Sequence, residues 1–278
     1  MLIVAGAFLV ASGVFHVGVY ALDDGGWDGP VSWRKPIEFG ISGGITALSL
    51  AAVMARLPRT SWLAWPCAVA VALFVPETLL IDLQRWRGVP SHFNHDTAFD
   101  LAVFDSMGIL VAVVALGIMV MTVWTLVSLR GPRSTNVAIR AGMVFLTIGQ
   151  FLGFAIVTNG LGVDDLSRAS IFGAAGEMKL PHAVALHGLQ VLGVLAVLLE
   201  RTGIPESRRT WLVVLGIAGY ALALIVGAVQ TFGGRAPLDL TPVALIGAGL
   251  AVVMLAIAYA AALRAVRTAA AIRGAPAN

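Results

Sequence analysis

The chain alternates between long apolar stretches and short polar connections along its whole length. Each apolar stretch is about 20 residues long, which is the length of helix that crosses the hydrocarbon core of a bilayer. The stretches are apolar on every face, so they do not fit the alternating strands of a membrane barrel. We therefore predict an all-α membrane protein, a bundle of about eight transmembrane helices, at Leu2–Leu22, Pro36–Ala55, Trp62–Asp82, Leu101–Leu129, Val137–Asn159, Pro181–Leu199, Trp211–Thr231 and Thr241–Leu263.

The composition agrees with a protein that lies almost wholly in a membrane. Of the 278 residues, 59% are hydrophobic and 12% are charged, whereas about 25% charged residues are usual in soluble domains. We predict one polytopic domain over residues 1–264 and a short basic cytoplasmic tail over residues 265–278. Cys67 is the one cysteine, which excludes an internal disulfide and a multi-cysteine metal site.

The basic residues are divided unequally between the two sides of the predicted bundle. Eleven follow spans two, four, six and eight: Arg56, Arg59, Arg130, Arg133, Arg140, Arg201, Arg208, Arg209, Arg264, Arg267 and Arg273. Seven follow the other spans: Arg34, Lys35, Arg85, Arg87, Arg168, Lys179 and Arg235. The positive-inside rule then predicts that both termini are cytoplasmic. We therefore attribute the net charge of +3 to the orientation of the spans rather than to nucleic-acid binding. We expect the apolar start of the chain to be a first span rather than a signal peptide.

Three polar connections fall on one side of a bundle of eight spans: Asp23–Lys35, Arg85–Asp100 and Gly160–Lys179. The polar residues within the spans lie toward the same side, whereas the opposite halves of the spans are almost purely apolar. Polar side chains in a membrane cost free energy and often mark a functional site. We therefore expect a one-sided polar site, although the sequence does not say which reaction or solute uses it.

The end of the third span carries the first candidate site residues. Glu77 and Gln84 are seven residues apart and share a helix face, with Arg85 beside Gln84. We expect acid–base roles for Glu77 and for Asp105 of the fourth span. Gln84 would orient a substrate, and Arg85 or Lys35 would bind its polar head. The alternative is that Glu77 forms a structural ion pair with Arg85 or Lys35.

The segment SHFNHD after the third span is dense in ligand groups. His92 and His95 are close enough to share a metal ion if the backbone turns, and His182 is a further candidate ligand, although the spacing is not a standard zinc pattern. His92 is also a candidate acid–base residue, and Asn94 would orient a substrate. A b-type haem between two facing histidines is a second cofactor hypothesis. The alternative is a solvated loop in which Ser91 or Asn94 caps the fourth helix.

The sixth span begins with PHAVALHGLQ. His187 and Gln190 are three residues apart and therefore adjacent on the helix surface. We expect His187 to take part in catalysis and Gln190 to orient a substrate. His182 lies five residues before His187, about 140° around the axis, so the two do not ligate one ion together without distortion. The alternative for His187 is a hydrogen bond between helices.

Three motifs, WRKPIEFGIS, QRWRGVPSHFN and GEMKLPHAVALHGLQ, span roughly residues 33–190. Together they resemble the pattern W-x-K-P-I, R-G-x-x-S-H-F-N and P-H-x-x-x-L-H-x-L-Q of uncharacterised bacterial multi-pass membrane proteins. The resemblance implies a protein of the bacterial inner membrane. It implies no activity and adds no catalytic roles.

Three functions compete at this point. The first, which we favour, is a membrane-embedded enzyme that acts on a lipophilic substrate, such as an isoprenoid, quinone or lipid, by acid–base or metal-assisted chemistry. The second is a transporter of a small solute or proton, against which the apolar cytoplasmic halves and the lack of a clear internal repeat both argue. The third is a structural or redox subunit of a larger complex. We expect the bilayer and a lipophilic small molecule as partners, and no nucleic acid.

Overall fold

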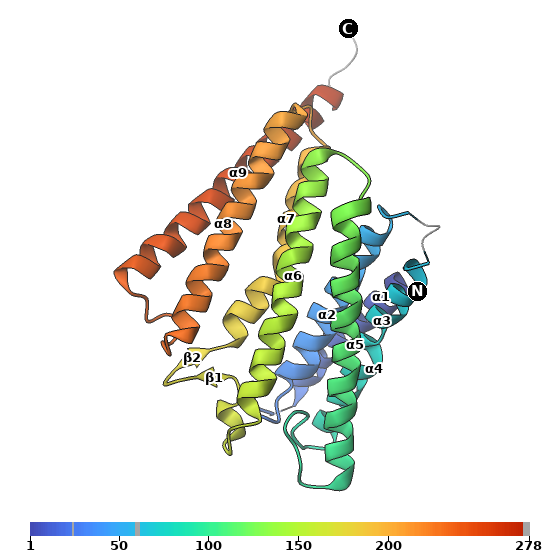
Figure 1. Ribbon diagram of the computed structural model, residues 1–278, viewed down its shortest axis with the longest axis vertical. Coiled ribbons are helices and arrows are strands. Elements are labelled where there is room, and N and C mark those ends of the chain that lie inside the picture. The colour runs from blue at the N-terminus through green and yellow to red at the C-terminus, as the bar shows by residue number, and fades with distance from the viewer. Residues whose placement is uncertain (24, 59–61, 275–278) are drawn as a thin grey trace. The chain divides into compact units, whose positions relative to one another are not determined.

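The computed structural model describes residues 1–23, 25–58 and 62–274, and the side chains up to Ala271 (Figure 1). Asp24, Arg59 and the end of the predicted tail lie outside the described residues, as does the side chain of Arg273. The elements in chain order are α1 (Leu2–Leu22), α2 (Arg34–Met54), α3 (Ala64–Ala72), α4 (Phe74–Trp86), α5 (Ala98–Ser128), α6 (Arg133–Gly160), a 3₁₀ turn (Leu166–Arg168), β1 (Ile171–Phe172), β2 (Gly176–Glu177), α7 (Lys179–Glu200), α8 (Glu206–Phe232) and α9 (Pro242–Gly274).

The predicted all-α architecture is confirmed. Among the described residues, eight helical segments are long and apolar enough to cross a membrane, with α3 and α4 together forming one of them, Ala64–Trp86. The only sheet in the part of the chain that the structure describes is a short antiparallel pair, in which Ile171 of β1 lies opposite Glu177 of β2. The chain is therefore a multi-pass membrane protein, while the membrane in which it resides and its orientation stay predictions.

The helices group into two compact units. Unit 1 comprises Met1–Val123 and Gly160–Ala169, and unit 2 comprises Trp124–Asn159 and Ser170–Asn278. The boundary falls inside α5 and at the end of α6. The division into one domain and a tail stays a prediction, and α9 continues to Gly274.

Glycines bring α1 and α2 of unit 1 into backbone contact. A Cβ added at Gly40 of α2 would lie 2.7 Å from the Cα and N of Gly13 in α1. A Cβ at Gly44 would lie 2.7 Å from the carbonyl oxygen of Gly6. Small residues at such positions let two helices approach closely inside a membrane. The same approach brings the polar residues of α1 next to the start of α2 and the end of α4.

The third span is broken at Leu73, between α3 and α4. The Leu73 amide donates to the carbonyl of Ala70, three residues back, rather than to the residue four back. Pro76 has no N–H to donate to the carbonyl of Ala72, so the regular ladder cannot continue through this turn. The break places Glu77 in the first turn of α4.

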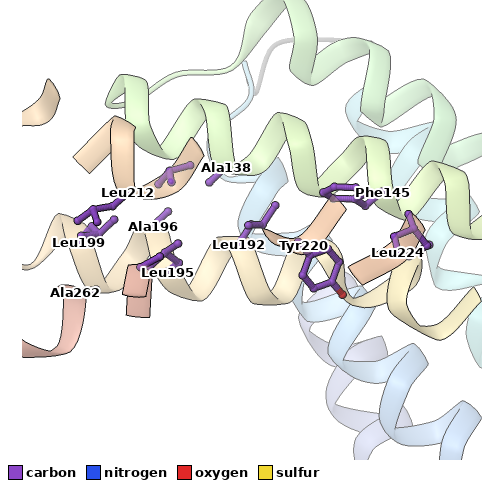
Figure 2. Close-up of a cluster of buried hydrophobic side chains, with 13 residues drawn as sticks. Ala138, Phe145, Leu192, Leu195, Ala196, Leu199, Leu212, Tyr220, Leu224 and Ala262 are labelled. Carbon is purple, nitrogen blue, oxygen red and sulfur yellow. The ribbon is translucent and has the colours of Figure 1, made fainter. Parts of the chain in front are cut away.

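The core of unit 2 is apolar and lies between α6, α7, α8 and α9. Figure 2 shows Leu192 and Leu195 of α7 among side chains from the other helices. The centres of the Phe145 and Tyr220 rings are 5.3 Å apart. The Tyr220 hydroxyl donates to the Val184 carbonyl at 2.5 Å, which satisfies its polar group inside the bundle. The core of unit 2 is thus apolar, whereas most of the buried charged side chains belong to unit 1.

Candidate functional site

Glu77 is a buried carboxyl group in the membrane-spanning part of unit 1. Its side chain is 2% exposed, and Oε2 has no hydrogen-bond partner among the described residues. Arg85, which the sequence offered as an ion-pair partner, instead donates to Asp23 Oδ2 at 3.1 Å. Lys35 Nζ donates to the Pro30 carbonyl at 3.1 Å. The carboxyl of Glu77 is therefore not held in a structural ion pair within the described part of the chain.

Gln84 belongs to a closed polar network around Asp100. Its Nε2 donates to Asp100 Oδ1 at 2.9 Å, and its Oε1 accepts from Arg87. Arg87 Nη1 also lies 2.5 Å from Asp100 Oδ1, and Thr97 Oγ1 donates to Asp100 Oδ2 at 2.6 Å. Both ends of the Gln84 amide are thus occupied, so the residue holds the loop before α5 rather than offering its amide to a substrate.

Thr97 and Asp100 form the cap of α5, which the sequence analysis missed. The Asp100 amide donates to Thr97 Oγ1 at 3.1 Å. The signal was present as a threonine followed three residues later by an acid, the pattern of a capping box. The cap is therefore Thr97 rather than Ser91 or Asn94, the residues named in the alternative of a solvated loop. Asn94 instead donates to the Pro90 carbonyl and accepts from the Asp96 amide, both at 3.1 Å, which closes a turn.

His92 lies in an aromatic setting within this loop. Its Nδ1 is 2.9 Å from Ser91 Oγ, and its ring lies 5.7 Å from Phe39 and 6.5 Å from Phe104. The next residue, Phe93, has a φ of 57°, a backbone conformation that a bulky residue adopts only when its surroundings hold it there. Burial, and to a lesser degree the positive charge of Lys35, lowers the pKa of His92 to about 3. His92 is therefore neutral at pH 7 and a weak base.

Lowering the pH from 7 to 5 is expected to reduce the free energy of unfolding by about 2 kcal/mol through His92. The unfolded chain takes up a proton at this residue below about pH 6.5, but the folded protein does so only near pH 3. Unfolding titrations at both pH values would measure the difference for the wild type and for H92Q. H95Q removes an exposed histidine of the same loop and is the control. An equal loss of stability in the wild type and in H92Q would contradict the prediction.

The remaining predicted residues of unit 1 lie at exposed positions. The His95 ring packs 5.6 Å from Phe104, and Asp105 is exposed on α5. Among the described residues, no group of three or more His, Cys, Asp or Glu side chains is placed to hold a metal ion. His182 belongs to unit 2, so unit 1 alone does not assemble the predicted ligand set. The metal and haem hypotheses stay predictions.

The predicted residues of α7 make contacts within unit 2. His182 Nδ1 lies 2.8 Å from the carbonyl oxygen of Gly149 on α6. A Cβ at Gly153 would lie 3.0 Å from the same ring, so α6 is shaped to receive it. With its amide turned so that the nitrogen faces the helix, Gln190 donates to the carbonyls of Leu186 and His187 of its own helix, at 3.1 and 3.2 Å. His182 therefore bridges α6 and α7, whereas the interhelical alternative was raised for His187. The metal role of His182 and the roles of His187 and Gln190 stay predictions.

Asp82, Ser12 and His16 form a hydrogen-bonded chain that was not among the predicted site residues. Ser12 Oγ donates to Asp82 Oδ2 at 3.1 Å. His16 Nδ1 lies 2.9 Å from the Ser12 carbonyl oxygen and 3.5 Å from Ser12 Oγ. Trp86 Nε1 donates to His16 Nε2 at 3.1 Å. Asp82 and Trp86 are each 70 residues from their partners in α1, so no local pattern in the sequence could pair them.

Trp33 and Arg85 cover the His16 end of this hydrogen-bonded series, next to the connection between α1 and α2. The His16 ring stacks on Trp33 at 5.8 Å, and Trp86 meets Trp33 edge-on at 5.1 Å. The Arg85 guanidinium lies 3.8 Å from the centre of the Trp33 ring and binds Asp23, to which Trp33 Nε1 also donates. The histidine is thus covered by aromatic groups and one cation, and only 3% of it is exposed.

The comparisons with known proteins found no protein-family model, no curated protein and no solved structure that matches this chain.

Proposed function

We propose that this multi-pass membrane protein is a membrane-embedded enzyme that acts on a lipophilic substrate by acid–base chemistry. The observation that carries the proposal is the Glu77 carboxyl, which is buried within a membrane-spanning helix and has no partner among the described residues for Oε2. A buried polar group without a partner costs free energy. A carboxyl in this state can exchange a proton with a substrate that enters from the lipid.

Four of the other predicted residues take different places in this proposal. Gln84 and Asn94 hold the loop before α5. We assign the acid–base step to Glu77 rather than to His92, whose pKa is lowered by burial. Lys35, in the first turn of α2, would attract an anionic head group by its charge. The protein would lie in a bacterial inner membrane with both termini in the cytoplasm, as the motifs and the arginine distribution suggest.

The proposal predicts that E77Q loses turnover with the fold intact. The purified protein would be placed in nanodiscs made from a bacterial lipid extract that contains quinones and isoprenoid lipids. Mass spectrometry would then follow the conversion of each lipid over time. We expect the wild type to convert one lipid class and E77Q to convert none, because glutamine cannot exchange a proton. E38Q, which removes a half-exposed carboxyl of α2, is the control. Undiminished conversion by E77Q would rule out the assignment.

Proton transport is the second candidate function, and the chain from Asp82 to His16 is the observation that favours it. Vesicles that contain the protein and a pH-sensitive dye would distinguish the two functions. Proton movement across the vesicle membrane that stops in D82N, without any conversion of lipid, would favour transport. Lipid conversion without proton movement would favour the enzyme.

A further inference from the structure

The contacts of His16 define where its proton lies. Trp86 Nε1 can only donate, so His16 Nε2, 3.1 Å away, must accept. The ring is therefore neutral, with its hydrogen on Nδ1. That hydrogen points toward Ser12, whose carbonyl oxygen is 2.9 Å away and whose Oγ is 3.5 Å away. Ser12 Oγ in turn donates to Asp82 Oδ2 at 3.1 Å. A continuous line of donors and acceptors thus runs from Trp86 to the carboxylate.

This line ends at the carboxylate of Asp82, which can accept a further hydrogen bond. Asp82 is 7% exposed, and its Oδ1 has no hydrogen-bond partner among the described residues. Among the described residues, the charged groups around the line are Asp82 itself and the Arg85–Asp23 pair above Trp33. On the α2 side, α1 packs at Gly13 against Ile41 and the backbone of Ile37, which bring no charge. The aspartate is thus the natural acceptor for a proton that enters at the histidine.

We propose that His16, Ser12 and Asp82 form a proton relay whose outer end is gated by the Trp86 indole. When Trp86 turns away, a hydronium ion gives a proton to His16 Nε2. The Nδ1 proton then passes to Ser12 Oγ, while the proton of the serine hydroxyl passes to Asp82 Oδ2. Ser12 regains a neutral hydroxyl, His16 is again neutral with its hydrogen on Nε2, and Asp82 becomes a carboxylic acid. The same steps in reverse return the proton to water.

Trp86 can act as the gate because it is more accessible than His16, which it covers. Its side chain is 57% exposed, whereas His16 is 3% exposed. While its N–H occupies Nε2, no water can protonate that atom. Rotation of the indole breaks one hydrogen bond and the ring contacts with Trp33 and His16, a local change that exposed side chains make rapidly.

The relay goes beyond the proposed function, because it delivers a proton into the membrane whether the protein is an enzyme or a transporter. Its test follows the arrival of the proton rather than turnover. In lipid nanodiscs, ¹⁵N-histidine NMR at pH 7 should show one neutral histidine with its hydrogen on Nδ1, and H16Q should lose that signal. A fast drop in pH should then produce the infrared band of a carboxylic acid that is absent in D82N. The same drop should move the His16 hydrogen to Nε2.

The decisive variant is S12A, which removes the bridging oxygen and leaves a small helix-forming residue. We expect the Asp82 acid band to form roughly 100-fold more slowly in S12A, the scale of a lost proton-transfer group. S49A is the matched control, because Ser49 Oγ donates only to the Ile45 carbonyl of its own helix at an exposed position. W86F, which lacks the N–H donor, should speed the formation of the band. Formation at the wild-type rate in S12A, or a His16 hydrogen on Nε2 in the wild type at pH 7, would overturn the relay.

Discussion

Replacement of Gly40 by alanine is expected to lower the free energy of unfolding by about 3 kcal/mol, the upper end of the usual cost of overpacking. The new Cβ would lie 2.7 Å from the backbone of Gly13 and 2.9 Å from the Leu9 carbonyl oxygen. Backbone atoms cannot turn aside as a side chain can, so α1 and α2 must separate. The higher helix propensity of alanine, worth up to about 1 kcal/mol, offsets only part of this cost. Titration with denaturing detergent, followed by circular dichroism, measures the change.

Gly43 provides the matched control on the same helix. A Cβ there would meet only the side chains of Leu9 and Phe74, at 3.8 and 3.9 Å, which are ordinary contact distances. G43A should therefore be neutral or slightly stabilising. Equal stabilities for the two variants would show that α1 and α2 are not in backbone contact in the membrane.

The second large effect is expected at Arg87. R87Q should lower the free energy of unfolding by about 2 kcal/mol, the typical value for hydrogen bonds to a charged group. Asp100 is 2% exposed and would lose its cationic partner, while Gln84 would lose the donor to its Oε1. The Arg87 guanidinium also lies 4.6 Å from the centre of the Phe99 ring. We expect a smaller loss of unfolding free energy than for a fully buried ion pair, because about a third of the Arg87 side chain is exposed.

The control for R87Q is R235Q. Arg235 and Asp239 form an ion pair whose side chains are 41% and 61% exposed, and exposed pairs contribute at most about 1 kcal/mol. A double-mutant cycle of R87Q with D100N would isolate the coupling of the buried pair. If R87Q costs no more than R235Q, the network around Asp100 does not hold the loop in place.

The spans could be predicted from the sequence because an apolar run needs no knowledge of its neighbours. The predicted bounds of the first span, Leu2–Leu22, are those of α1. The third span shows the limit of this reasoning. The prediction ended it at Asp82, where polar residues begin, but α4 continues to Trp86. Gln84 and Arg85 can continue the helix because Asp100 and Asp23 satisfy their polar groups, and these partners lie 16 and 62 residues away in the sequence.

The candidate site was only partly predictable for the same reason. Glu77 could be named from a single acid within an apolar run. Whether Glu77 forms an ion pair depends on the directions of the Arg85 and Lys35 side chains, and these directions follow from the fold rather than from the local sequence. His16 and Asp82 were visible as polar residues within spans, but their connection through Ser12 depends on the close approach of α1 to its neighbours. A serine in an apolar helix gives no sign of which partner it will meet.

The contact between α1 and α2 also bears on how the protein is made. Both helices lie within the first 54 residues and are joined by a short connection, residues 23–33. Their contact requires nothing from the rest of the chain, and contacts between segments close in sequence form early. The pair can therefore assemble as a hairpin while the ribosome is still synthesising α3. Trp33 would then already stack on the His16 ring, whereas His16 Nε2 would lack its hydrogen-bond donor until Trp86 is translated and inserted.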